Sequence, residues 1–329
     1  MVLYQPILSI LLQRRHQCIN MKKQFLVLCS LAVSFLQAQN KPVIDVQDVL
    51  RIETTLAADN MQGREIFTEG IEDASAFIEK EFAAIGLEYF DGLTSYKQAF
   101  NVGKKSANNV VGVLTGKTKP NEYVVFSAHY DHLGKAKKGK DLIFNGANDD
   151  ASGTTAVIAL AKYFKALNNN ERTLVFVTFT GEEVGGFGSE YFTNHINAEG
   201  VVAMFNIEMI GTESKWGKNA AYITGFEKSD FGNILQNNLK GIGFNFYEDP
   251  YPQEQLFYRS DNARLAAVGV PAHTISTSKM DSEPNYHKVS DEVATLDIEN
   301  MTEIIKSIAL SSASIIKGTD TPTRVAKLK

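Results

Sequence analysis

Three short runs of β-branched and aromatic residues constrain the fold of this 329-residue chain more than any other feature. They span residues 122–126, 172–180 and 201–207, and their length and composition predict buried strands. Further strands are expected at 96–102, 109–114, 220–224 and 272–276, and helices at 46–56, 71–85, 151–167, 230–240, 263–268 and 297–316. Strands that alternate with helices predict an α/β fold, a three-layer sandwich in which helices flank a central mixed, mainly parallel β-sheet.

Ionisable side chains follow each of the three runs directly. His129 ends the first predicted strand, Glu182 and Glu183 follow the second, and Glu208 follows the third. Asp149 precedes the predicted helix 151–167, whose positive N-terminal end favours an ionised carboxylate. Because ligands bind beyond the carboxyl ends of the strands in open α/β sheets, we expect these side chains to meet at one rim.

Asp131 lies two residues after His129, so the two side chains should share one face of the strand end. A metal-bound histidine usually donates its other ring N–H to a carboxylate or a carbonyl, and Asp131 is placed to accept it. A lone His-x-Asp is more often a solvent-facing pair, and the acids further along the chain are what favour a metal ligand here. The Gly-x-Gly at 186–188 suggests a dinucleotide-binding loop, but it lacks the third glycine and follows two acids, so we reject that interpretation.

Residues 21–40 have the layout of a secretory signal peptide. Met21-Lys22-Lys23 precedes an apolar run from Phe25 to Leu36, and cleavage is expected near Ala38. The run is too short to span a bilayer, which favours an exported protein, periplasmic or extracellular, without stable membrane insertion. We therefore interpret residues 1–38 as signal peptide and residues 39–329 as one domain, and we favour a start codon assigned too early as the origin of residues 1–20.

Both cysteines, Cys18 and Cys29, lie in this leader. A metal site in the rest of the chain must therefore be built from His, Asp and Glu. Removal of the leader deletes four basic residues and no acid, so the formal net charge of −5 becomes −9. A mildly acidic chain is a poor candidate for binding nucleic acid or an anionic membrane.

Five separated motifs follow one another in a recognisable order. They are His129-x-Asp131, Asn-Asp-Asp-Ala-Ser-Gly at 148–153, Gly-Glu-Glu at 181–183, Asn-Ile-Glu-Met-Ile-Gly at 206–211, and Tyr286-His287. Together they resemble the zinc aminopeptidases of the M28 metallopeptidase family over about residues 45–317. The resemblance implies a zinc-peptidase fold, peptide substrates, and two zinc ions that share one carboxylate.

The resemblance also assigns a role to each matching residue. Asp149 would bridge the two ions and be joined to Asp150 by a cis peptide bond. The ligand sets it implies are His129 with Glu208 at the first ion and Glu183 with His287 at the second. Glu182 would be the general base, and Tyr286 matches a tyrosine that hydrogen-bonds the developing oxyanion in some relatives. The family more often has aspartate where this chain has Glu208, so the resemblance supports the second ion more strongly than the first.

Other polar residues are interpreted from their local pattern. We expect His132 to line the loop after the strand, His195 to lie at the surface, and His273 to be a core residue. Asp291 either supports the site from behind its ligands or caps the last helix, and the position just before that helix favours the cap.

Three residues lie in segments whose fold the pattern leaves open. Arg259 and Asp261 either contact a substrate terminus or form a structural salt bridge. Arg64 belongs to the loop 59–64, which either lies near the substrate or is a turn with an exposed arginine.

The leading hypothesis is an exported dizinc aminopeptidase that removes N-terminal residues from peptides. A glutaminyl-cyclase-like transferase, which would share the fold but use a single zinc ion, is the first alternative, and the number of bound ions distinguishes the two. A non-catalytic binding protein on a peptidase fold is the second alternative, although such proteins usually lose ligands or the base. The sequence leaves the oligomeric state and the preferred N-terminal residue open.

Overall fold

The computed structural model describes residues 42–328, and the expected signal peptide lies outside the described residues. The strands within this part are β1 (Glu88–Tyr89), β2 (Lys97–Val102), β3 (Lys105–Leu114), β4 (Lys119–His129), β5 (Arg172–Phe179), β6 (Val201–Ile207), β7 (Ala220–Ile223), β8 (Asn245–Glu248) and β9 (Ala272–Ser276). The helices are α2 (Val46–Leu56), α3 (Glu69–Ile85), α4 (Ser152–Leu167), α5 (Phe187–His195), α6 (Phe231–Asn238), α7 (Asn262–Ala267), α8 (Ile298–Ser311) and α9 (Ala313–Lys317).

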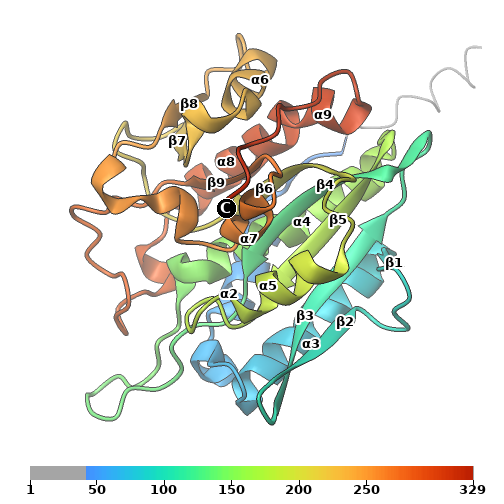
Figure 1. Ribbon diagram of the computed structural model, residues 1–329. Helices are drawn as coiled ribbons and strands as arrows, with labels where there is room; N and C mark the ends of the chain where they lie inside the picture. Colours follow the sequence, from blue (N-terminus) through green and yellow to red (C-terminus); the bar gives the residue numbers. More distant parts are fainter. Residues whose placement is uncertain (1–41, 329) are drawn as a thin grey trace, which may run out of the picture. The chain divides into compact units, whose positions relative to one another are not determined.

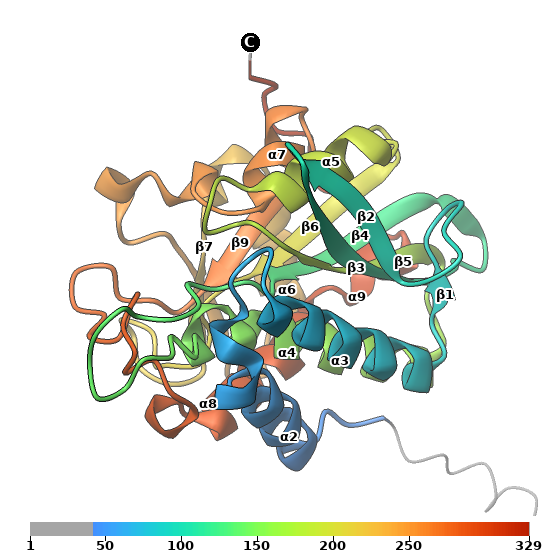
Figure 2. The same cartoon turned by 90° about the horizontal axis from the view of Figure 1, so that it is seen from below.

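One mixed sheet contains all of these strands, in the order β1-β3-β5-β4-β6-β9-β7-β8, with β2 paired to β3. Its centre is parallel, because β4 runs parallel to both β5 and β6, and β6 runs parallel to β9. Towards the edges the direction changes, since β3 is antiparallel to β5 and β7 is antiparallel to β9. Helices α2, α3, α4 and α8 cover one face, and α5 and α7 cover the other (Figures 1 and 2). The predicted three-layer α/β class is confirmed.

Phe126 in the middle of β4 shows why the three central strands stay in register. Its ring lies 5.7 Å from that of Phe176 in β5 and 4.9 Å from that of Phe205 in β6. On the same side it packs 5.4 Å from Phe164 of α4. This aromatic layer joins the strands to the helix between them, and so fixes where their carboxyl ends lie relative to one another.

Two differences from the sequence prediction have identifiable causes. Strand β8 lies in a stretch expected to be irregular, and its signal was the alternation of the two buried residues Phe244 and Phe246. The last predicted helix is two helices, which meet at Ser312. The hydroxyls of Ser311 and Ser312 donate to the carbonyls of Ile308 and Ala309, which competes with continued helical bonding there.

The edge formed by β7 and β8 carries an aromatic stack. Trp216, the single tryptophan of the sequence, stacks on Tyr247 of β8 with ring centroids 4.2 Å apart and an angle of 11° between the planes. Among the helices of residues 42–328, none has both the length and the apolar character that crossing a bilayer requires.

Candidate metal centre

Asp149 lies between two histidines that come from distant parts of the chain. Its Oδ1 is 3.3 Å from Nε2 of His129 at the end of β4, and its Oδ2 is 3.2 Å from Nε2 of His287. His287 belongs to the loop between β9 and α8. The two oxygens of one carboxylate therefore face two different imidazoles, which is the arrangement expected of a carboxylate that bridges two ions.

Glu183 contacts His287, as expected, and it also contacts His132, which was not expected to belong to this centre. Oε2 of Glu183 lies 3.1 Å from Nε2 of His287, and Oε1 accepts a 2.7 Å hydrogen bond from Nδ1 of His132. Within the described residues, one group of three possible ligand atoms clusters within 4.8 Å, and it comes from His132, Asp149 and Glu183. His132 was expected only to line the loop. The available signal was a second histidine three residues after His129.

Glu208 follows β6 and is half-buried, with its Oε2 atom shielded from solvent. Burial raises the pKa of its carboxyl to about 7. The clustered group contains neither Glu208 nor His129 from the first expected ligand set, and it contains His132 in place of His287 from the second.

The centre contains buried polar atoms that have no hydrogen-bond partner within the described residues. They include Nε2 of His129, Nε2 of His132, Oδ2 of Asp149 and Oε2 of Glu208. Buried polar side chains are nearly always paired, so a group of unpaired acceptors and imidazole nitrogens indicates a missing partner. Histidine and carboxylate are zinc ligands, and a divalent cation would satisfy these atoms and compensate their charge. The residues present therefore fit the zinc that their chemistry implies.

The titration behaviour of the centre shows how its charges interact. Burial raises the pKa of Glu182 well above its ordinary value, and the nearby acids Glu208, Asp261 and Asp131 add to that rise. Burial also acts to raise the pKa of Asp149, but the adjacent imidazoles outweigh it and the pKa lies below its ordinary value. A strongly shifted pKa of this kind is typical of residues at functional sites.

Asp131 supports the centre with two different groups. Its main-chain carbonyl accepts a 3.1 Å hydrogen bond from Nδ1 of His129, which leaves Nε2 free to bind a metal. Its carboxylate lies 3.8 Å from that nitrogen and instead accepts the main-chain N–H groups of Glu182, at 3.2 Å, and Glu183, at 3.4 Å. Asp131 therefore orients both the first histidine and the acidic pair.

The backbone at Asp149 is held from both sides. The peptide bond between Asp149 and Asp150 is cis, which confirms the expectation. The Asp150 carboxylate accepts the N–H groups of Gly153 and Met209, each at 3.0 Å. The Asp291 carboxylate accepts those of Asn148, at 2.8 Å, and Asp149, at 3.0 Å.

The last of these contacts corrects the prediction that Asp291 caps the final helix. Helix α8 begins after Asp297, whose side chain accepts the N–H of Asn300. Asp291 belongs instead to the support of Asp149, because backbone amides from a segment far away in sequence come within its reach.

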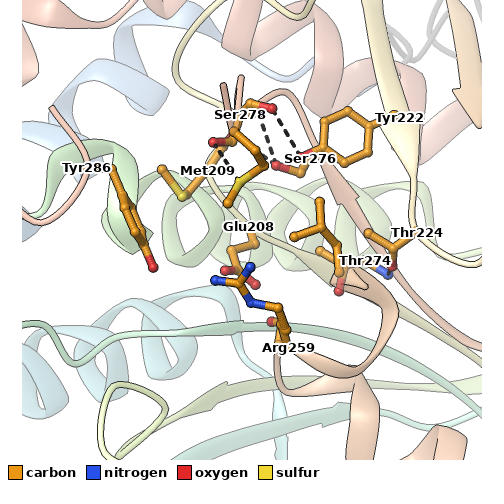
Figure 3. A pocket seen from close by; sticks show the side chains of 12 residues that line it. Glu208, Met209, Tyr222, Thr224, Arg259, Thr274, Ser276, Ser278 and Tyr286 are labelled. Carbon is orange, nitrogen blue, oxygen red and sulfur yellow. Dashed lines mark hydrogen bonds between the residues drawn. The ribbon is translucent and has the colours of Figure 1, made fainter. Parts of the chain in front are cut away.

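Tyr286 and Glu208 line one cavity, shown in Figure 3. The Tyr286 ring stacks on that of His287 at 3.9 Å, and 37% of the tyrosine is exposed. Burial raises the pKa of its hydroxyl above the ordinary value, so the group remains a hydrogen-bond donor at neutral pH.

Arg259 and Asp261 are not paired with each other. Arg259 forms a 2.8 Å ion pair with Glu254, and it lines the cavity beside Glu208. Asp261 is buried, and neither of its oxygens has a hydrogen-bond partner among the described residues. It lines a second cavity together with Glu182.

The remaining predictions concern residues away from the ligands. His195 is exposed and His273 lies fully buried in β9, as expected for each. The prediction of a turn with an exposed arginine is wrong. Arg64 is completely buried and donates to four main-chain carbonyls.

Known proteins resemble this chain in sequence. The model of peptidase family M28 matches residues 109–311. A probable leucine aminopeptidase of Trichophyton verrucosum is 27% identical over 60% of this chain and 54% of its own length. The chain spans little more than half the length, or less, of the first curated relatives that it matches.

Solved structures share the fold. The LapA aminopeptidase of Legionella pneumophila superposes with a TM-score of 0.66 at 20% identity, covering 83% of this chain and 71% of that one. The glutaminyl cyclase of Porphyromonas gingivalis superposes with a TM-score of 0.65 at 13% identity, covering 84% of this chain and 100% of that one. Because these identities are low, the two structures support the fold and do not distinguish between the two activities.

Proposed function

We propose that this chain, which belongs to peptidase family M28, is a zinc-dependent aminopeptidase that removes N-terminal residues from peptides. The observation that carries the proposal is the Asp149 carboxylate, whose oxygens lie 3.3 Å from His129 and 3.2 Å from His287. A proton-transferring acid, Glu182, follows β5 at the same rim of the sheet.

Two zinc ions are proposed. His129, Asp149 and Glu208 would hold the first, and Asp149, Glu183 and His287 would hold the second. When bound, zinc lowers the pKa of a coordinated water to about 7 and polarises the scissile carbonyl. His132 would keep its hydrogen bond to Oε1 of Glu183 and thereby orient the carboxylate towards the second ion.

Glu182 is proposed to move the proton of the reaction. It accepts a proton from the attacking water and later delivers it to the nitrogen of the leaving amine, and such transfer typically contributes about 10²- to 10⁴-fold. Its main-chain N–H is fixed by the Asp131 carboxylate at 3.2 Å, so the side chain starts from a defined position. The Tyr286 hydroxyl is proposed to donate a hydrogen bond to the developing oxyanion.

The test of the function combines a metal count with an activity scan. Purified protein is analysed for zinc and is assayed on aminoacyl 4-nitroanilides with and without a chelator. We expect two ions per chain and hydrolysis that the chelator abolishes. One ion together with cyclisation of N-terminal glutaminyl peptides would establish the transferase instead, and zinc binding without turnover of either substrate would establish a binding protein.

A substitution separates the chemistry from metal binding. Glu182→Gln should keep the metal content and reduce kcat at least about 100-fold, because the amide cannot accept the proton. Glu303→Gln, an exposed change on α8, is the matched control and should keep full activity. Near-normal kcat in Glu182→Gln would show that another group is the base.

Export is also proposed, and its support is the sequence of residues 21–40 alone. Expression of the full chain in a bacterium with an export pathway should yield a protein outside the cytoplasm whose first residue lies near Gln39. N-terminal sequencing measures this directly, and a cytoplasmic protein that retains residues 21–38 would contradict the proposal.

A further inference from the structure

The cavity beside Glu208 has a mixed lining, in which the apolar side chains of Met209, Leu256 and Met280 lie together with a set of serine and threonine residues. Five serine and threonine residues contribute to it, and four of them are buried: Thr224, Thr274, Ser276 and Ser278. These four come from β9 and from the residues that follow β7 and β9. Figure 3 shows Thr224, Thr274 and Ser276 on the side of Glu208 that faces away from Tyr286, with Tyr222 next to Ser276.

Some of the hydroxyls that line the cavity already donate hydrogen bonds within the protein. Thr274 Oγ1 donates to Asn262 Oδ1 at 2.9 Å, and the Tyr222 hydroxyl donates to the Ser278 carbonyl at 3.1 Å. These bonds fix the wall of the cavity. The hydrogen bonds that the cavity can make to a ligand therefore depend on the other hydroxyls.

The remaining hydroxyls keep hydrogen-bonding capacity. Thr224 Oγ1 accepts the N–H of Thr274 at 3.2 Å, and its own proton has no acceptor within the described residues. Ser276 Oγ accepts the N–H of Ser278 at 3.1 Å, and its own proton is donated over 3.4 Å to the Met209 carbonyl, which is a long bond. Ser278 Oγ has the Met280 sulfur as its acceptor at 3.8 Å, and sulfur accepts weakly.

The charges around the cavity favour neither sign of ligand. Arg259 lies at its rim, but Glu254 pairs with that guanidinium at 2.8 Å. Glu208 is expected to bind a cation. Charged groups lose much of their hydration when they enter a cavity, and neutral hydroxyls replace it poorly. A side chain that carries an uncharged polar group matches the hydroxyl part of this lining best.

We propose that the cavity receives the side chain of the N-terminal residue of the substrate and selects hydroxyl or carboxamide side chains over apolar side chains of the same shape. The inference rests on the proposed aminopeptidase function, and it concerns which substrate that site takes. An apolar side chain would cover the hydroxyls of Thr224, Ser276 and Ser278 without pairing them, and sites that hydrogen-bond a substrate group discriminate strongly against analogues that lack it.

The experiment uses two pairs of isosteric substrates. The zinc-loaded enzyme is assayed on 4-nitroanilides of threonine against valine, and of asparagine against leucine. We expect kcat/KM to be at least about tenfold higher for the polar member of each pair. Ratios at or below one in both pairs would overturn the inference while leaving the aminopeptidase function standing. Hydrolysis of none of the four would overturn both.

Substitution of one hydroxyl tests whether this cavity causes the preference. Thr224→Val keeps the shape of the side chain and removes its hydroxyl, so the threonine-to-valine ratio should fall at least about threefold. Thr118→Val is the matched control, because Thr118 is exposed and lies directly before β4, and it should leave the ratio unchanged. Ser276→Ala provides a second variant should Thr224→Val fold poorly, and unchanged ratios in both variants would overturn the assignment.

Discussion

Replacement of Arg64 by lysine should destabilise the fold by several kcal/mol although the charge is kept. The guanidinium is fully buried and donates to four carbonyls: Tyr130 at 2.8 Å, Leu56 at 2.8 Å, Asn145 at 2.6 Å and Gly146 at 2.9 Å. These acceptors come from the end of α2, from the residue after β4, and from the turn before Asp149.

The magnitude follows from the geometry of the two side chains. Lysine donates three protons from one nitrogen, whereas the guanidinium donates in a planar fork. We expect about two carbonyls to lose their donor, each at about 1–3 kcal/mol, which gives about 4 kcal/mol in total. For a domain of this size the melting temperature should fall by about 10 °C.

The assay is urea unfolding followed by far-UV circular dichroism, in chelator so that zinc binding does not contribute. Arg51→Lys is the control, because Arg51 is an exposed arginine that pairs with Glu81 and Asp48, and such pairs contribute about 1 kcal/mol or less. If Arg64→Lys and Arg51→Lys unfold within about 0.5 kcal/mol of each other, the four-carbonyl contact does not hold the loop as argued.

Three further changes give separate tests. The buried Glu53 has a pKa raised to about 8 by burial, from 4.5, so the folded state binds its proton more tightly and stability is lost as pH rises through this window. Glu53→Gln should therefore stabilise the protein by roughly 3–5 kcal/mol at pH 9 and hardly at all at pH 4, measured by unfolding at both values. Asp291→Asn retains one acceptor oxygen for two N–H groups and should weaken zinc binding about 10- to 100-fold in a chelator competition, while a fully retained affinity would deny Asp291 its supporting role. A Cβ on Gly153 would overlap the Ile207 carbonyl oxygen, so Gly153→Ala should cost about 1–3 kcal/mol by thermal unfolding, and unchanged stability would show that α4 can move away from β6.

The strand ends were predictable because they depend on local pattern. Apolar runs of strand length located β4, β5 and β6, and the topology rule for open sheets placed His129, Glu183 and Glu208 at one rim. The resemblance to a known family then supplied the pairing of Asp149 with His287. These predictions did not depend on how the loops pack against one another.

The supporting residues were not predictable for the opposite reason. His132 lies beyond the end of β4, where the two-residue alternation no longer tells which way a side chain points. Its ring lies against Gly146, where an added Cβ would approach the ring to 2.5 Å, so its position depends on a loop packed above it. Arg64 and Asp291 likewise bind carbonyls and amides that are distant in sequence, and any residue can supply such groups, so no side-chain pattern marks them.

The stack of Trp216 on Tyr247 gives the molecule an optical label at a known place. With a single indole in the chain, fluorescence emission reports on the β7–β8 edge, whereas circular dichroism reports on the whole sheet. Each of these two strands has only four residues. If this edge detaches before the central strands separate, the emission change will precede the loss of ellipticity in a denaturant titration, and coincident curves will mean that both parts melt as one unit.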